Sequence, residues 1–317
     1  SNFGDIEFNN SENFNWDQIK KDIHSAFNLN EKELIELRKN VENEFDLNII
    51  TDKIEKIYAR SYVLKRKYDI PVIMYHRVVN DESEGGVHGT YITAKKFDEH
   101  MKYLKENNYE PITFKELLKL NYRNRFNNGK KYIILTFDDG YEDNYKIAFP
   151  ILKKYQFNCI IYLVSHLNYN KWDVEVPENP EKEFPLMTWD MIKEMQEYGI
   201  RIWRAYYDSP KNLLIYPLSR QKEEITKSTE FLEGKLGEKL VCFAYPYGDL
   251  NEEVKEFVKE TGYSFAVATD SGDLSFSEDL FQIRRIGIFP TNNMFSFKRK
   301  VHGNYNFIKL RREQKII

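Results

Sequence analysis

Cysteine is scarce in this chain, which has only two among its 317 residues, Cys159 and Cys242. Both lie in apolar stretches that are typical of strands, NCIIYLV and LVCFAYP. The sequence therefore predicts two buried, reduced thiols, and it leaves a disulfide between them open. With so few cysteines, the cellular compartment does not follow from them.

An excess of charge of one sign is also missing. Lys and Arg total 47 and Asp and Glu total 50, which gives a formal net charge of -3. This balance argues against strong attraction to nucleic acids or anionic membranes, and we expect no nucleic-acid partner. No apolar run is long enough to span a bilayer and no signal peptide is visible, so we expect no transmembrane segment in this chain. Because the chain begins with Ser1, the missing signal peptide says little about export.

Aromatic residues, by contrast, are plentiful, with 22 Tyr and 22 Phe in a chain that is 15% aromatic. Most of these rings are expected to build the core, because each buries a large apolar area. Aromatic rings on loops can also stack on sugar rings.

The sequence pattern divides the chain in two. Residues 1–69 are polar and charged, and two stretches, 15–29 and 31–45, carry apolar residues at helical spacing. We interpret them as an N-terminal helical extension. Residues 70–317 form the second region, in which strand-like and helix-like stretches alternate. No internal repeat or low-complexity tract is present.

The alternation in the second region predicts an α/β fold, a (β/α) TIM-like barrel with parallel strands. Strands are expected at 71–76, 131–137, 158–164, 200–203, 239–245, 264–269 and 281–289, and helices at 92–108, 147–155, 187–199, 219–237 and 251–262. In such a barrel the chemistry lies where the strands end. The strand ends here carry His76, Asp138, Asp139, Tyr247, Asp270 and the stretch IWRAYYD.

Asp138 and Asp139 follow the apolar run YIILTF and precede Gly140. Adjacent side chains on an extended strand point to opposite sides, so one carboxylate is available to bind a metal while the other acts as a base. Asp-Asp-Gly is also good turn chemistry, and for the dipeptide alone a turn is the simpler interpretation. The polar residues at the other strand ends favour the functional one.

His76 ends the strand PVIMYH and is either a hydrogen-bonded rim residue or a general acid, because imidazole exchanges protons near neutral pH. The stretch AYPYG, which contains Tyr247, ends another strand. Its proline and glycine predict an unusual backbone that can leave an amide free to stabilise an oxyanion, although a plain loop is an equal interpretation. His302 is expected at the surface.

Taken together, several motifs resemble those of the NodB-type polysaccharide deacetylases, carbohydrate esterase family four. They are VIMYHRV, LTFDDGYEDNY with AFPILKKY, MTWDMIKEM, FAYPYGDLNEEV, GYSFAVAT and RRIGI, and they span about 70–288. The MYHRV motif is similar to the branch that includes secreted poly-N-acetylglucosamine deacetylases.

The resemblance implies a distorted (β/α) barrel that hydrolyses N-acetyl groups of an amino-sugar polysaccharide. It gives roles to five residues: Asp138 as the catalytic base, Asp139 as a metal ligand, His76 as the general acid, Tyr247 as the source of an oxyanion-binding amide, and Arg285 as a site-organising residue. It also implies export to the cell surface or the extracellular space.

The chain departs from the family at the other two metal ligands. The family carries histidines in a motif written GSHTxxHP, and the equivalent stretch here is WRAYYDSP. Ala205 and Ser209 occupy the histidine positions. A catalytic zinc site has about three protein ligands, and Asp139 alone supplies one. We therefore expect no metal cofactor unless the site is rebuilt, for example with Asp208 as an oxygen ligand for a zinc-like or harder divalent cation.

Three functions remain open from the sequence. The first is a deacetylase-fold protein with impaired or lost activity, kept for binding a glycan or a partner of a cell-surface polysaccharide system. The second is an active deacetylase with an atypical metal site that includes Asp139 and Asp208. The third is metal-free acid–base chemistry by Asp138 and His76. The glycan and the oligomeric state are not predicted.

Overall fold

The computed structural model describes residues 70–86, 88–120, 131–164, 169–170, 183–206, 214, 216–269, 276 and 279–302. All of them belong to one compact unit, Glu55–Ile317. The predicted N-terminal helical extension lies outside the described residues, as do Asp208, Ser209 and Asp270. None of the described helices combines the length and the apolarity that crossing a membrane requires.

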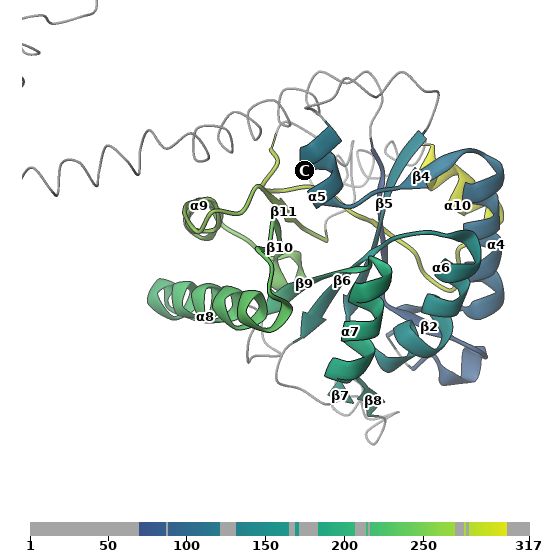
Figure 1. The fold of residues 1–317 in the computed structure, drawn as a ribbon, viewed down its shortest axis with the longest axis horizontal. Coiled ribbons are helices and arrows are strands. Elements are labelled where there is room, and N and C mark those ends of the chain that lie inside the picture. The colour runs from purple at the N-terminus through teal and green to yellow at the C-terminus, as the bar shows by residue number, and fades with distance from the viewer. Residues whose placement is uncertain are drawn as a thin grey trace, which may run out of the picture. The chain divides into compact units, whose positions relative to one another are not determined.

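A sheet of parallel strands forms the centre of the domain (Figure 1). Its strands follow the order β11-β10-β9-β6-β5-β1-β12, and β4 pairs with the start of β5. The bounds are β1 Val72–Tyr75, β4 Tyr109–Pro111, β5 Lys131–Asp139, β6 Ile160–Val164, β9 Arg201–Tyr206, β10 Cys242–Ala244, β11 Phe265–Val267 and β12 Ile286–Gly287. Two further pairs lie apart from this sheet, β2 Arg77–Val79 with β3 Tyr91–Thr93 and β7 Tyr169–Asn170 with β8 Phe184–Pro185.

The two ends of the sheet are joined by the segment that leads into β12. Val267 at the end of β11 forms a parallel bridge with Ile283, and β12 then pairs with β1 through Ile73 and Ile286. The sheet therefore closes on itself through one short, irregular connection. This confirms the predicted (β/α) barrel and explains its distortion. The sequence predicted one continuous strand over 281–289, which is wrong, because only two residues of that stretch form regular strand pairs.

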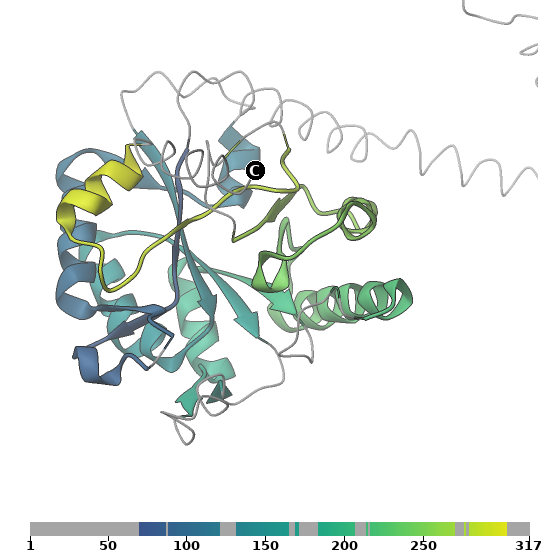
Figure 2. The same cartoon turned by 180° about the vertical axis from the view of Figure 1, so that it is seen from behind.

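Helices lie around the outside of the sheet (Figures 1 and 2). They are α4 Ala94–Glu106, α5 Phe114–Leu120, α6 Phe149–Tyr155, α7 Trp189–Tyr198, α8 Leu218–Leu236, α9 Glu252–Glu260 and α10 Met294–Val301, with short helical turns at Glu82–Glu84, Asn144–Ala148 and Pro246–Gly248. Side-chain caps begin several of them, as when Thr188 accepts from the Met191 amide and Asn251 from the Val254 amide. The sequence analysis missed α5, α10 and β4.

Many aromatic rings lie in the core, as the composition predicted, among a larger number of aliphatic side chains. Tyr75 packs against Phe97 and Phe137 with ring centroids 5.2 and 5.3 Å apart. Deeper in the barrel, Trp203 on β9 packs against Phe114 and Tyr162 and is 1% exposed. Both cysteines are buried and free, which confirms the predicted reduced thiols.

Candidate active site

A pocket of about 340 Å³ opens where the strands end. It gathers residues from the ends of β1, β5, β10 and β11 and from the β12 region, as expected for the carboxyl end of a parallel barrel. Its lining consists of Met74, His76, Asp138, Asp139, Ala244, Tyr245, Pro246, Tyr247, Thr269, Arg285 and Phe289. The structure thus brings together five residues that the sequence proposed for one site, namely His76, Asp138, Asp139, Tyr247 and Arg285.

Asp138 is held by Arg285 through two hydrogen bonds. Arg285 Nη1 donates to Asp138 Oδ1 at 2.5 Å and Arg285 Nη2 donates to Asp138 Oδ2 at 2.9 Å. Arg285 is 1% exposed, and its Nε donates to the Ala268 carbonyl at 2.9 Å. Its guanidinium carbon also lies 5.3 Å from the centroid of the Tyr162 ring. This bidentate pair fixes the carboxylate and compensates its charge inside the protein.

His76 directly follows β1 and is positioned by its backbone. Asn144 Nδ2 donates to the His76 carbonyl at 2.8 Å, and the next residue, Arg77, donates from Nε to Asp143 Oδ2 at 2.8 Å. The motif YEDNY therefore anchors the motif MYHRV. His76 Nε2 lies 3.9 Å from Asp138 Oδ2, which is an ion-pair distance but too long for a hydrogen bond.

The charge state of His76 is set by its surroundings. Burial lowers the pKa of His76, the Asp138 carboxylate raises it, and Arg285 lowers it, with a net decrease from the ordinary value of 6.5. The ring is therefore largely neutral at neutral pH and able to exchange a proton with a ligand in the pocket.

Asp139 lines the same pocket as Asp138, and its backbone departs from the extended strand on which we based the expectation of opposite side-chain directions. That expectation assumed an extended backbone, but Asp139 has a φ of 71° and Gly140 one of 73°. Gly140 is required here, because a Cβ at that position would lie 2.5 Å from Leu163 Cδ2. The turn and the site are therefore the same feature rather than alternatives.

The Asp139 carboxylate is buried and incompletely satisfied. Its Oδ2 has no hydrogen-bond partner among the residues that the structure describes. Burial and the neighbouring Asp138 charge raise the pKa of Asp139 to about 7, and a hydrogen bond from Tyr141 partly opposes them. A buried carboxylate oxygen without a hydrogen-bond partner is costly, and binding a cation would compensate it.

The residues that the structure describes do not complete a metal site around Asp139. Within the described ranges, no group of three or more His, Cys, Asp or Glu side chains lies close enough to hold a metal ion. Ala205 lies near the end of β9, and it has no partner in the pairing with β6, because Leu163 pairs with Arg204 and Val164 with Tyr206. Alanine has no side-chain atom that could bind a metal. The donor set that the structure describes is therefore Asp139 alone, which is too few for a catalytic zinc.

The predicted unusual backbone at AYPYG is confirmed. Tyr247 has a φ of 58° and Gly248 one of 78°. A Cβ at Gly248 would lie 2.0 Å from Thr269 Oγ1, and that hydroxyl donates to the Tyr247 carbonyl at 2.9 Å. The tight turn therefore holds Tyr247 at the pocket rim, where 41% of the residue is exposed.

Three lining residues escaped the sequence analysis: Met74, Thr269 and Phe289. Met74 lies within the recognisable stretch VIMYH, two residues before His76, and Phe289 directly follows RRIGI. Alternation within β1 was the available signal for Met74, because it places Met74 and His76 on the same face. Nothing in the sequence marked Phe289 as a pocket residue.

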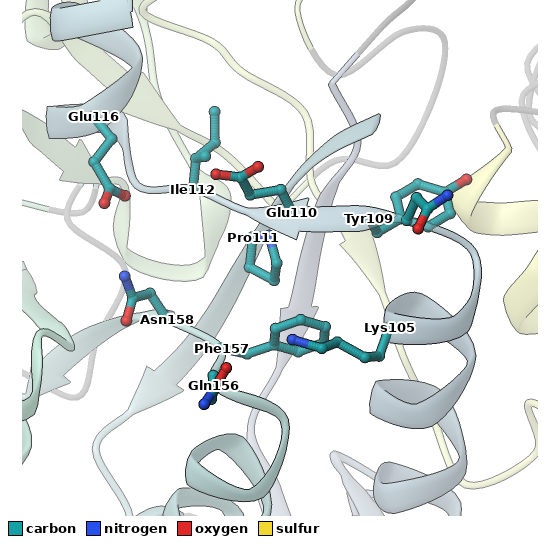
Figure 3. A pocket seen from close by; sticks show the side chains of 10 residues that line it. Lys105, Tyr109, Glu110, Pro111, Ile112, Glu116, Gln156, Phe157 and Asn158 are labelled. Atoms are coloured by element: carbon teal, nitrogen blue, oxygen red, sulfur yellow. The ribbon is translucent and has the colours of Figure 1, made fainter. Parts of the chain in front are cut away.

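A second, larger hollow of about 590 Å³ lies at the other end of the sheet (Figure 3). It is lined by residues before β5 and β6, among them Glu110, Glu116 and Asn158. Glu116 is already engaged, since its Oε2 accepts from the amide and the hydroxyl of Thr113. This hollow faces the amino ends of the strands, the end that serves stability rather than chemistry in barrels.

Comparison with known proteins indicates which family this chain is similar to. Residues 126–266 match the family described as polysaccharide deacetylase. YxkH of Bacillus subtilis, named as a putative polysaccharide deacetylase, is 28% identical over 221 residues, which cover 70% of this chain and 72% of that protein. The poly-beta-1,6-N-acetyl-D-glucosamine N-deacetylase of Escherichia coli K12 is 25% identical over 72% of this chain, which spans only 38% of that enzyme.

Solved structures support the same assignment. A polysaccharide deacetylase from Bacillus cereus is 25% identical, with a TM-score of 0.58 over 74% of this chain and 69% of that one. The deacetylase PplD of Streptococcus pyogenes shares the fold, with a TM-score of 0.62, 23% identity, and coverage of 74% of this chain and 98% of that one. Over residues 126–266 the chain matches the polysaccharide deacetylase family, and these relatives make the region around that match similar to the deacetylase domain of the NodB type, carbohydrate esterase family four.

Proposed function

We propose that this protein binds an acetylated amino-sugar polysaccharide in the pocket of Asp138, His76 and Arg285, and that its metal-dependent N-deacetylation is impaired or lost. One observation carries the proposal: the acid–base part of the site is assembled, while Ala205 stands at a position where the family has a metal-binding histidine. The choice of polymer rests on relatives that are named as poly-beta-1,6-N-acetyl-D-glucosamine N-deacetylases.

The residues of the pocket divide the work of binding between them. Asp138, fixed by Arg285, offers carboxylate oxygens to a hydroxyl or amide N–H of the sugar. The neutral imidazole of His76 offers both a donor and an acceptor. In an active enzyme the same pair would serve as base and acid, and the backbone amide near Tyr247 would stabilise the oxyanion.

Hydrolysis needs a nucleophile that this donor set does not provide. In metal-dependent hydrolases the bound ion lowers the pKa of its water from far above neutral to about 7. One carboxylate, Asp139, cannot hold such an ion in place of about three ligands. Water in this pocket therefore stays a poor nucleophile, and turnover is expected to be slow or absent.

The test combines metal content, acetate release and binding. Purified protein is incubated with excess zinc, nickel, cobalt or manganese, desalted, and measured by elemental analysis beside Asp139→Ala. We expect neither protein to keep near-stoichiometric metal, no metal-stimulated acetate release from N-acetylglucosamine oligomers, and measurable oligomer binding that Asp138→Ala weakens. Metal-stimulated acetate release by the wild-type protein would sink the proposal.

The orphaned Oδ2 of Asp139 favours one alternative, an active enzyme with a rebuilt oxygen-rich site. In that case Asp208 would be the second carboxylate ligand. Near-stoichiometric metal that is lost in both Asp139→Ala and Asp208→Ala, together with acetate release, would support this alternative. Activity that survives both substitutions would remove it.

Two further assignments belong to the same proposal. By family resemblance we propose that the protein acts at the cell surface or outside the cell, which fractionation of producing cells tests directly. We also propose that residues 1–69 form a helical extension separate from the domain that begins at residue 70. Helical circular dichroism of a 1–69 fragment, or its absence, tests the second assignment.

A further inference from the structure

Two aromatic residues stand exposed at the rim of the pocket that holds His76, Asp138 and Asp139. Phe289 and Tyr247 both line it, and each is 41% exposed. The remaining apolar lining, such as Ala244 and Tyr245, is buried. A phenylalanine has no polar atom that would favour exposure, so an exposed ring next to a binding pocket is a candidate contact surface.

Phe289 is held by a network of hydrogen bonds rather than by a loose loop. Its amide donates to Asn292 Oδ1 at 2.9 Å, and the Asn292 amide donates to the Phe289 carbonyl at 2.9 Å. Lys300 Nζ, from α10, donates to the same Asn292 Oδ1 at 2.8 Å and to the Gly287 carbonyl at 2.6 Å. Lys300 is only 2% exposed.

A second lysine holds the same loop from another helix. Lys96 Nζ, on α4, donates to the Pro290 carbonyl at 2.8 Å. The segment from Gly287 to Asn292 is therefore tied to two helices, α4 and α10. A ring that is fixed before the ligand arrives loses little conformational entropy on binding.

The position of the Phe289 ring also depends on Gly287. A Cβ at Gly287 would lie 2.9 Å from two atoms of the Phe289 ring, Cε2 and Cζ. The ring therefore lies against bare backbone, and any larger residue at 287 must displace it. The geometry makes Gly287 a positioning residue for Phe289.

We propose that the Phe289 ring is a stacking platform for a pyranose ring of an N-acetylated amino-sugar oligomer at the mouth of this pocket. The inference rests on the proposed glycan-binding function and names a residue that determines its affinity. A pyranose has an apolar C–H face and a polar edge. Its face packs on the ring of Phe289, while its edge reaches the polar groups of His76 and Asp138 inside the pocket.

Binding of short N-acetylglucosamine oligomers, β-1,6-linked and β-1,4-linked, to Phe289→Ala by calorimetry tests the platform. We expect roughly tenfold weaker binding, since truncating a well-placed aromatic contact costs more than about 1 kcal/mol. Phe289→Trp should restore the affinity, because it restores the stacking face. Phe295→Ala is the matched control, since Phe295 lies on nearby α10, is 68% exposed and does not line the pocket.

A double-mutant cycle separates positioning from general damage. Gly287→Ala should weaken binding several-fold in the wild-type background and have no further effect in Phe289→Ala, if it acts only by displacing the ring. Unchanged affinity in Phe289→Ala, with intact binding by the wild type, overturns the platform and leaves the proposed function standing. If the wild type binds neither oligomer, the proposed function itself fails.

Discussion

Asp138 and Asp139 are neighbours in the chain but have different environments. Asp138 is paired with Arg285, which lies 147 residues away, while Asp139 keeps one buried oxygen without a partner in the described part. The sequence identified both residues, because TFDDG is a distinctive motif. It did not predict the positive φ of Asp139, because non-glycine residues seldom adopt this conformation.

The Asp138–Arg285 pair leads to a prediction about stability. Arg285→Met removes the cation and leaves a carboxylate in a site that is 8% exposed, so we expect a loss of about 3–5 kcal/mol in the free energy of unfolding. Urea denaturation measures it. The double variant Arg285→Met/Asp138→Asn should recover part of the loss, because it removes the uncompensated charge.

The control for this prediction is a surface pair. Lys102 and Glu106 form an ion pair one helical turn apart, 3.9 Å between the charged atoms and 62% exposed on each side chain. Lys102→Met should leave the unfolding midpoint nearly unchanged. If Arg285→Met behaved like Lys102→Met, the buried pair would contribute nothing to stability.

A second prediction at this scale concerns the turn that holds Tyr247. Gly248 and Gly237 have similar positive φ values, 78° and 67°, but only Gly248 has atoms in the way of a Cβ. We expect Gly237→Ala to cost about 1 kcal/mol through backbone strain alone, and Gly248→Ala to cost about 1–3 kcal/mol more through the clash with Thr269. Equal losses in urea denaturation would show that the turn relaxes freely around Thr269.

At the scale of elements, strands that carry a continuous run of apolar residues were predictable from the sequence, and short strands were not. The stretch KYIILTF predicted β5, and the structure extends it to Asp139. The segment 281–289 also contains alternating apolar residues, but only Ile286–Gly287 forms a strand. The rest of the segment connects the two edges of the sheet, and its Arg285 side chain binds Asp138. Helix α10 had a signal that was overlooked, since Asn293 accepts from the Ser296 amide as an N-cap.

Helices α4 and α10 meet at His100, which gives a pH prediction. His100 Nδ1 lies 3.1 Å from the Tyr75 hydroxyl, and its ring stacks on Phe297 of α10 at 3.7 Å between centroids. Burial, together with the charges of Lys300 and Lys96, lowers the pKa of His100 from 6.5 to about 3. The unfolded chain therefore binds the proton more tightly, so stability is complete above about pH 6.5 and falls as the pH drops towards 3.

The change that tests this coupling is His100→Gln, which keeps an acceptor for Tyr75. Between pH 7 and pH 5, protonation of His100 in the unfolded chain should lower the free energy of unfolding of the wild type by about 2 kcal/mol. His100→Gln should not show this part of the decrease. Unfolding free energies at both pH values measure the difference. His302→Gln serves as the control, because His302 is exposed at the end of α10, and parallel pH profiles for wild type and His100→Gln would exclude the assignment.

At the scale of the molecule, the barrel was predictable because parallel strands need helical crossovers, and thus leave an alternating pattern in the sequence. The location of the site followed from the same rule. The position of Phe289 at the pocket's rim did not follow from it. Phe289 lies on a loop that Lys300 and Lys96 hold through hydrogen bonds from distant helices, and such long-range contacts leave no local pattern in the sequence. Sequence reasoning therefore found Tyr247 at the rim of the pocket but missed Phe289 beside it.

The last prediction concerns how much of the chain the fold needs. The described core begins at Ile70, and the first backbone pairing of the barrel is the Ile134 amide with the Pro71 carbonyl, just before the central strand β1. A chain that begins at residue 70 therefore keeps every described strand, helix and core residue. We expect residues 70–317 to unfold in one cooperative transition, within a few degrees of the full chain, and to bind the same oligomers. A much lower melting temperature, measured by calorimetry, would mean that residues 1–69 contribute to the stability of the domain.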